Sequence, residues 1–477
     1  MKKIILCTGI FFLSKCLPAQ NVGVGTTTPE EKLHVEGNIK ADTLKPNRLK
    51  LIHNAAAGKI LTSDAEGNAS WQAADAGSGS IGYGTWGDCA TNAIISGFQP
   101  VTDTNANPAN RYFGWAVAMS GNFAAIGETQ DQGIGSVNIF QFNGIEWVFT
   151  EKITDPTGAV SDLFGASVSI DGDNIIVGSP GDNVGANSNQ GSACIFHFDG
   201  VNWVFQQKLT FSAGAAGDEF GASVSISGIY AVIGAPRDDI FVSDQGSATV
   251  FRFDGSNWVQ MINLSDDAIG ASSDLFGWSV SISGETLIVG IPGSTVAGNS
   301  NRGSANIFKH TPSNWTLVQK LIDIEGDTDD SFGWSVSISG DYAVAGAPYD
   351  AVSTSINRGS ATVFRNNNGT WVRTNKLQDN GLTTYDMFGT SVSLSGDYLV
   401  VSAPYDDVDL NPQQGTAYIY RRTGPVWKKF MHFHDPGGDA NELFGTGVAI
   451  DHVSKKFLIG VPFFSSNAGE AIFGKIN

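Results

Sequence analysis

The stretch SDLFGASVSIDGDNIIVGSP, residues 161–180, decides the fold because the chain repeats it. A near copy, SDLFGWSVSISGETLIVGIP, occupies residues 273–292. Its Phe-Gly pair marks seven copies, which begin at Phe113, Phe164, Phe220, Phe276, Phe332, Phe388 and Phe444. The copies are 51 residues apart once and 56 residues apart five times. Such an even period over seven copies predicts a repeat architecture.

Each unit contains four strand-like runs. In the third unit these are ASVSIS (222–227), YAVIGA (230–235), SATVFRF (247–253) and WVQMINL (258–264). Short alternating or apolar runs joined by Gly-rich turns predict antiparallel strands. Seven units of four strands predict an all-β fold, a seven-bladed β-propeller of four-stranded antiparallel blades. The first strands are rich in Ser and Ala and the last two carry Phe and Trp, which is the taper that a radial array needs.

The two ends of the repeat predict how the ring closes. The seventh unit stops after its third strand, and a stray strand, AIISGFQPVTD (93–103), precedes the first unit. We expect this N-terminal strand to complete the last blade, because two open edges would expose unpaired backbone groups. The propeller is therefore expected to span residues 91–477.

The units resemble FG-GAP repeats, which build the integrin α-chain propeller and many bacterial surface proteins. The resemblance is carried by Phe164-Gly165 with Gly178-Ser179-Pro180, and by the matching residues of the other units. The first unit departs from it, with Gly127-Glu128-Thr129 and no proline. Integrin-type propellers often hold calcium in Asp-x-Asp-x-Asp-Gly loops between the first two strands. Tight hairpins replace these loops here, so the family's calcium sites cannot be carried over by position.

An acid stands two residues before most of the Phe residues. The series runs Asp162, Asp218, Asp274, Asp330, Asp386 and Glu442, and Arg111 interrupts it. One interpretation is a metal site, in which these carboxylates coordinate Ca²⁺ together with Asp155, Asp266, Asp323 or Asp379. The other is structural, with each Asp accepting backbone N–H bonds where the chain turns into the inner strand. The structural interpretation is favoured because a turn-building acid should recur once per unit.

The aromatic residues of the repeat are predicted to be structural. Each Phe of the Phe-Gly pair is expected to fill the space between blades, and the Gly to let two backbones approach closely. The six Trp residues from Trp147 to Trp427 are expected in the core. An exposed Trp would instead indicate carbohydrate stacking.

The N-terminal 90 residues differ from the repeats. Residues 1–19 are predicted to be a signal peptide, with Lys2 and Lys3 before a short apolar core; a lipoprotein anchored through Cys16 is the minority alternative. Residues 20–75 resemble short stems of exported bacterial proteins of the Bacteroidetes type and of phage tail fibres, which implies a homotrimer. Residues 76–90 are a Gly/Ser-rich linker. Cys89 and Cys194 have no motif spacing, and whether they pair stays open.

Composition and motifs narrow the function. The net charge of −19 argues against nucleic acid or an anionic membrane as partner, and no later run is long enough to be a transmembrane segment. The two longer loops of each unit are acidic and share one face, which we predict binds protein or glycan as an adhesion module outside the cell or on its surface. No nucleophile elbow or phosphate loop is present, so no enzyme is expected. A polysaccharide-active enzyme that uses loop carboxylates, and a structural surface protein without a specific ligand, remain the alternatives.

Overall fold

The computed structural model describes residues 22–24, 33–35, 59–63, 69–73, 95–103, 111–266, 270–312, 314–352, 355–408, 411–435 and 437–476. The chain divides into two compact units, residues 1–78 and 79–477. The signal peptide, Cys16, the Gly/Ser linker and Cys89 lie outside the described residues. Cys194 is buried in the second unit.

The first unit contains two short strand pairs. Strands β1 (Val22–Val24) and β2 (Leu33–Val35) pair in parallel. Strands β3 (Lys59–Ser63) and β4 (Ala69–Ala73) pair antiparallel, with Leu61 opposite Trp71. Both pairs fall within the segment predicted to be the stem.

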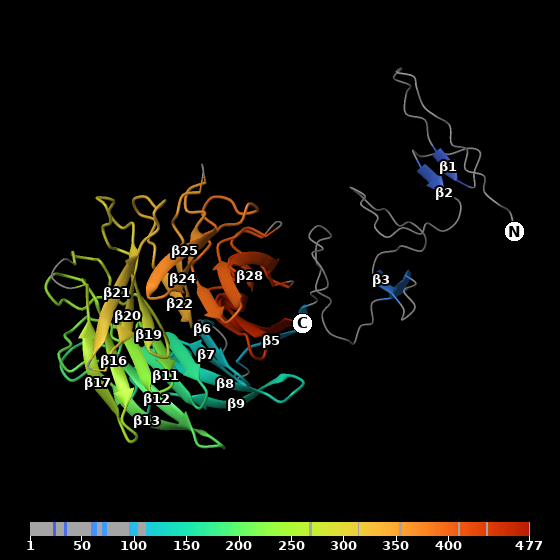
Figure 1. Cartoon of the computed structure of the whole chain (residues 1–477). Coiled ribbons are helices and arrows are strands. Elements are labelled where there is room, and N and C mark those ends of the chain that lie inside the picture. The colour runs from blue at the N-terminus through green and yellow to red at the C-terminus, as the bar shows by residue number, and fades with distance from the viewer. Residues whose placement is uncertain are drawn as a thin grey trace. The chain divides into compact units, whose positions relative to one another are not determined.

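The second unit is a β-propeller of seven four-stranded antiparallel sheets, as the repeat predicts (Figure 1). Blade 1 comprises β6 (Phe113–Ser120), β7 (Phe123–Glu128), β8 (Ser136–Phe142) and β9 (Trp147–Ile153). Blade 2 comprises β10 (Ser167–Asp171), β11 (Asn174–Ser179), β12 (Ser192–Phe198) and β13 (Trp203–Leu209). Blade 3 comprises β14 (Ser223–Ser227), β15 (Tyr230–Ala235), β16 (Ser247–Phe253) and β17 (Trp258–Leu264).

The remaining blades follow the same order. Blade 4 comprises β18 (Ser279–Ser283), β19 (Thr286–Ile291), β20 (Ser304–His310) and β21 (Trp315–Leu321). Blade 5 comprises β22 (Ser335–Ser339), β23 (Tyr342–Ala347), β24 (Ser360–Asn367) and β25 (Thr370–Leu377). Blade 6 comprises β26 (Val392–Ser395), β27 (Tyr398–Ala403), β28 (Thr416–Thr423) and β29 (Val426–Phe433).

Blade 7 joins the two ends of the propeller, which confirms the predicted closure. It comprises β30 (Val448–Asp451), β31 (Lys456–Val461), β32 (Glu470–Ile476) and the N-terminal strand β5 (Ile95–Val101). Strand β5 pairs antiparallel with β32, with Val101 opposite Ala471, and lies beside the C-terminus (Figure 1). The first strands of neighbouring blades contact one another in turn, and β30 contacts β6, so the ring is closed. The helical segments among the described residues are a 3₁₀ turn, η1 (Asp131–Gly133), and one turn of helix, α1 (Phe464–Asn467).

The packing between blades confirms the predicted roles of the aromatic repeat residues. All seven Phe residues of the Phe-Gly pairs are completely buried, and the six Trp from Trp147 to Trp427 are at most 5% exposed. Each Phe-Gly glycine has a positive φ and lies against backbone of the preceding blade, as Gly221 does against Ser179 and Ser192. A side chain has no room there, which is why the repeat requires glycine.

The serines of the inner strands have a second role that residue size alone does not predict. Ser167 Oγ donates a hydrogen bond to the carbonyl of Gly221 in the next blade, 2.8 Å away. Ser223, Ser279 and Ser335 make the same bond to the Phe-Gly glycines of the following units. The inner ring is therefore held together by polar contacts as well as by the small size of its residues.

The loops make the two faces of the propeller unequal, as the sequence predicts. Two residues join β10 to β11 and four join β12 to β13, whereas residues 180–191 join β11 to β12 and residues 210–222 join β13 to β14. Both long connections emerge on the same side, where each first strand begins. We call this side the long-loop face and the opposite side the hairpin face.

Candidate functional site

The acids that precede the Phe-Gly pairs are buried at the turn into each inner strand. Asp162 Oδ2 accepts a hydrogen bond from the backbone N–H of Ala159, 2.6 Å away. The counterparts Asp218, Asp274, Asp330 and Asp386 accept the same bond from the residue three positions earlier. The structure places these five carboxylates one per blade junction and does not bring them together.

Burial changes the acidity of this series. It raises the pKa of Asp218 and of Asp330 to about 6, against the opposing backbone hydrogen bond. Burial also raises the pKa of Asp162, Asp274 and Asp386. The Oδ1 atoms of Asp162 and Asp274 are buried without a hydrogen-bond partner among the described residues. One oxygen of these carboxylates therefore serves the turn, and the other is not used by it.

A second set of residues forms ion pairs between neighbouring blades. Lys208, on the fourth strand of blade 2, lies 2.8 Å from Asp155, which follows the fourth strand of blade 1, and 2.5 Å from Asp182 of its own blade. Lys376 of blade 5 makes the equivalent pairs with Asp323 and Asp350, both at 2.7 Å. Sequence reasoning grouped Asp155 and Asp323 with the calcium candidates, but in the structure a lysine ammonium contacts their carboxylates.

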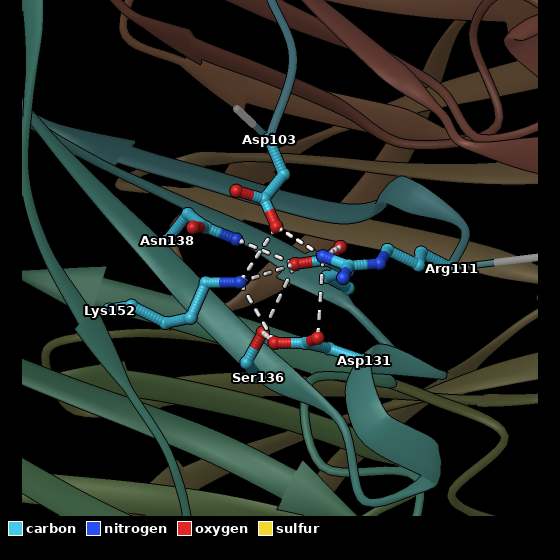
Figure 2. Close-up of polar contacts among 7 residues, drawn as sticks. Asp103, Arg111, Asp131, Ser136, Asn138 and Lys152 are labelled. Carbon is cyan, nitrogen blue, oxygen red and sulfur yellow. Dashed lines mark hydrogen bonds and ion pairs between the residues drawn. The ribbon is translucent and has the colours of Figure 1, made fainter. Parts of the chain in front are cut away.

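The densest polar cluster lies where the ring closes (Figure 2). Asp103, just after β5, Glu128, at the end of β7, and Asp131 have carboxylate oxygens that lie within 4.8 Å of one another. Lys152 Nζ contacts all three carboxylates, at 2.9 Å, 3.0 Å and 2.8 Å. Arg111 Nη1 lies 2.6 Å from Asp103 and also contacts Glu128 and Asp131.

The charge balance of this cluster explains why the first repeat departs from the others. Glu128 replaces the small or apolar residue that ends the second strand of the other blades, and Arg111 replaces the usual acid. Burial raises the pKa of Glu128, while its hydrogen bond from Lys152 opposes the shift. Burial alone would lower the pKa of Lys152, but its bonds to Asp131, Asp103 and Glu128 raise it.

The cluster does not fit a metal ion as it stands. Three carboxylates would suit a hard cation such as Ca²⁺. Here, however, the ammonium of Lys152 already contacts one oxygen of each carboxylate. We therefore interpret the cluster as an ion-pair latch that ties the end of the closing strand to blade 1.

The junction between blades 6 and 7 contains acids without a matching cation. Asp435, Glu442 and Glu470 are all less than 9% exposed, and among the described residues none of the three makes an ion pair with a basic residue. Burial and the charges of Asp435 and Glu442 raise the pKa of Glu470 to about 8. Burial, with Asp435 and Asp439, raises the pKa of Glu442 to about 7.

Aromatic residues gather at the inner edge of the long-loop face. Trp115, Trp278 and Trp334 directly follow the Phe-Gly pair and are partly exposed, Trp115 by 40%. Trp278 and Trp334 come from adjacent blades, and their ring centroids are 4.7 Å apart. Trp334 meets Tyr349 edge-on at 5.4 Å. Sequence reasoning missed these residues, although their irregular occurrence in an otherwise regular repeat is a signal that could have found them.

The geometry defines the class of the protein: a closed seven-bladed β-propeller with one elaborated face. Five stretches match the family model for the FG-GAP repeat, residues 147–196, 203–251, 258–308, 315–364 and 371–420. Because these stretches cover more than half of the chain, the chain belongs to the FG-GAP repeat family. The matches omit blade 7 and most of blade 1, where the charge clusters replace repeat residues.

Two further findings concern the whole chain. A comparison with curated proteins gave no match. In the part of the chain that the structure describes, no helix has the length and hydrophobicity needed to cross a lipid bilayer.

Proposed function

We propose that this chain is an exported, non-enzymatic binding module that holds a protein or glycan ligand on its long-loop face. The supporting observation is the inequality of the two faces. The hairpin face is trimmed to turns as short as two residues, whereas the long-loop face carries extended, partly exposed connections in each of the blades. Rigid scaffolds that vary their loops on one side commonly use that side for recognition.

Charge narrows the proposed ligand. The long loops carry many exposed acids, including Asp239, Asp327 and Asp329. Several basic side chains near them are turned inward, because Arg302 is buried and donates a 2.7 Å hydrogen bond to the carbonyl of Asp323. The face therefore suits a neutral or basic partner.

Loop replacement tests this function. Residues 239–243 and 327–329 would be replaced by Gly-Ser segments of equal length, which removes exposed loop side chains and keeps buried Asp238 and Asp330. The full chain would be applied to an array that carries glycans, collagen, fibronectin and laminin, and to neighbouring bacterial cells. We expect the replacement to abolish binding, measured as at least tenfold loss of signal.

A matched control alters the opposite face. Asp173→Ser with Glu285→Ser removes two exposed acids from the hairpin face and leaves every long loop intact. This variant should bind as the unaltered chain does. Binding that survives the loop replacement, or that is lost equally in the control, would contradict the proposal.

The non-enzymatic part of the proposal needs its own test. Burial raises the pKa of Asp406, on the long-loop face, to about 7, which is the range of a general acid. We expect no release of reducing sugar when the chain is incubated with the same glycans. Turnover that Asp406→Asn abolishes would favour the polysaccharide-active enzyme instead.

A further inference from the structure

The aromatic residues at the inner edge of the long-loop face are not required by the fold. Trp278 and Trp334 occupy the position after the Phe-Gly pair, where blades 2 and 3 have Ala166 and Ala222. Thr390 and Thr446 hold the same position in blades 6 and 7. The propeller therefore tolerates a small side chain there, and the tryptophans need another explanation.

These tryptophans belong to a continuous aromatic surface that crosses three blades, which we call the aromatic arc: Trp278, Trp334, Tyr349 and Tyr405. The Trp278 and Trp334 rings are tilted by 50° at 4.7 Å, and Trp334 and Tyr349 lie at 85° and 5.4 Å. Tyr405 lies close enough to Tyr349 to raise its pKa, together with burial. All four side chains are partly exposed, so the arc presents ring surface to solvent.

Polar groups lie beside the arc. The exposed residues Asp327, Thr328 and Asp329 precede Trp334 on the same loop, and Asn301 donates a 2.9 Å hydrogen bond to Asp329. Carboxylate and hydroxyl oxygens accept hydrogen bonds from hydroxyl groups. Aromatic rings flanked by such acceptors match a ligand that has both apolar C–H faces and many hydroxyl groups.

Nearby basic residues are committed to the protein itself. Arg302 and Arg358, from the loops of blades 4 and 5, are buried and donate to the backbone carbonyls of Asp323 and Asp379. Arg373 pairs with Asp323 and Glu325. Together with the exposed acids, this arrangement disfavours sulfated or carboxylated ligands.

We propose that the aromatic arc is a binding site for a neutral polysaccharide, whose sugar rings stack on Trp278 and Trp334 while their hydroxyl groups bond to the adjacent acidic loop. This inference rests on the proposed function of the long-loop face and names its ligand class. The extent of the arc over three blades suits several consecutive sugar units of a polymer.

Affinity gel electrophoresis of the full chain tests the site. The probes are xylan, laminarin, glucomannan, galactan and dextran, with alginate and heparin as anionic controls. We expect at least one neutral polysaccharide to retard the chain and the anionic ones not to. Trp278→Ala and Trp334→Ala should each weaken binding about tenfold, because a stacked aromatic ring contributes about one factor of ten in affinity.

Trp115→Ala is the matched control. It removes a tryptophan at the same position of the repeat, but from blade 1, where Trp115 packs with Tyr112 and Phe463 instead of with the arc. Binding should stay within twofold of the unaltered chain. Because alanine occupies this position in blades 2 and 3, all three variants should fold, and circular dichroism melting should show it.

The outcomes separate this inference from the proposed function. No retardation by any neutral polysaccharide, or equal loss in Trp115→Ala and Trp334→Ala, overturns the polysaccharide site. If the array then shows a protein ligand that the loop replacement abolishes, the binding function stands without the glycan site. If neither assay finds a ligand, both proposals fail.

Discussion

At the scale of single residues, the repeat is set by places where only one side chain fits. Gly221 has a φ of +95°, and a Cβ on it would overlap the carbonyl oxygen of Ser192 in the preceding blade. The Phe before it is completely buried. The Phe-Gly pair is thus a packing device, in which a large ring fills the junction and its neighbour lets two backbones meet.

This predicts a large cost for Gly221→Ala. The left-handed conformation and the overlap with Ser192 should together destabilise the propeller by about 3 kcal/mol. Gly255→Ala is the control, since Gly255 also has positive φ, +102°, but open space around it. Urea denaturation should show a cost of only about 1 kcal/mol there. Equal costs at both positions would mean that the close approach between blades does not constrain Gly221.

A second residue-scale prediction concerns pH. Because the pKa of Glu470 is raised from 4.5 to about 8 in the folded chain, the folded state binds a proton more tightly than the unfolded state does. Its contribution to the free energy of unfolding is therefore most favourable below about pH 4.5 and is lost as the pH rises towards 8. Glu470→Gln should raise stability at pH 8 by on the order of 2 kcal/mol and leave it nearly unchanged at pH 5.

Asp155→Asn provides the opposite case. Burial by itself raises the pKa of Asp155, but Lys208 and the backbone of Thr157 hold it below 3.8. Its stabilising charge is present at both pH values, so this variant should be less stable than the unaltered chain at pH 5 and at pH 8. Urea denaturation at the two pH values measures both variants. A Glu470→Gln variant that is weaker at pH 8 would refute the argument.

At the scale of elements, strand β5 has two tasks. It supplies the fourth strand of blade 7 by pairing with β32, and its end carries Asp103 into the ion-pair latch with Arg111 and Lys152. Phe98 on this strand packs against the core shared by blades 6 and 7. The strand thus contacts the blade it completes and, through the latch, the blade that follows.

We predict that removing β5 opens the propeller. A chain that lacks residues 1–103 loses the partner of β32 and leaves a bare strand edge, which favours aggregation. Its melting temperature should fall by several degrees or more, and size-exclusion chromatography should show oligomers. A chain that lacks only residues 1–78 keeps β5 and should melt as the full chain does. Identical melting of the two truncated chains would show that closure does not depend on β5.

Between elements, what the sequence could predict depended on distance along the chain. Strand boundaries, hairpins and the closing strand follow from local alternation and from an even period. The Lys208–Asp155 pair does not, because it joins residues of two blades that only the assembled ring brings together. The same holds for the serine bonds of the inner strands, which reach a glycine in the next unit.

At the scale of the whole molecule, the seven junctions share one backbone plan but differ in charge. Lys152 and Arg111 balance three acids where the ring closes, Lys208 and Lys376 bridge two acids each, and the junction of blades 6 and 7 has acids alone. The candidate site could not be predicted from the period for the same reason. A repeat indicates what all units share, whereas Trp278 and Trp334 are found by asking where units differ.

The pairing of Ile95 with Ile476 has a consequence for biosynthesis. A ribosome makes the first partner early and the second among its final residues, so no nascent chain can seal the circle before translation ends. Joining partners so far apart costs loop-closure entropy, which grows with the logarithm of the intervening length. Until then every growing intermediate has two sticky margins, and a chaperone that shields them would be of most use to this chain while it is still incomplete.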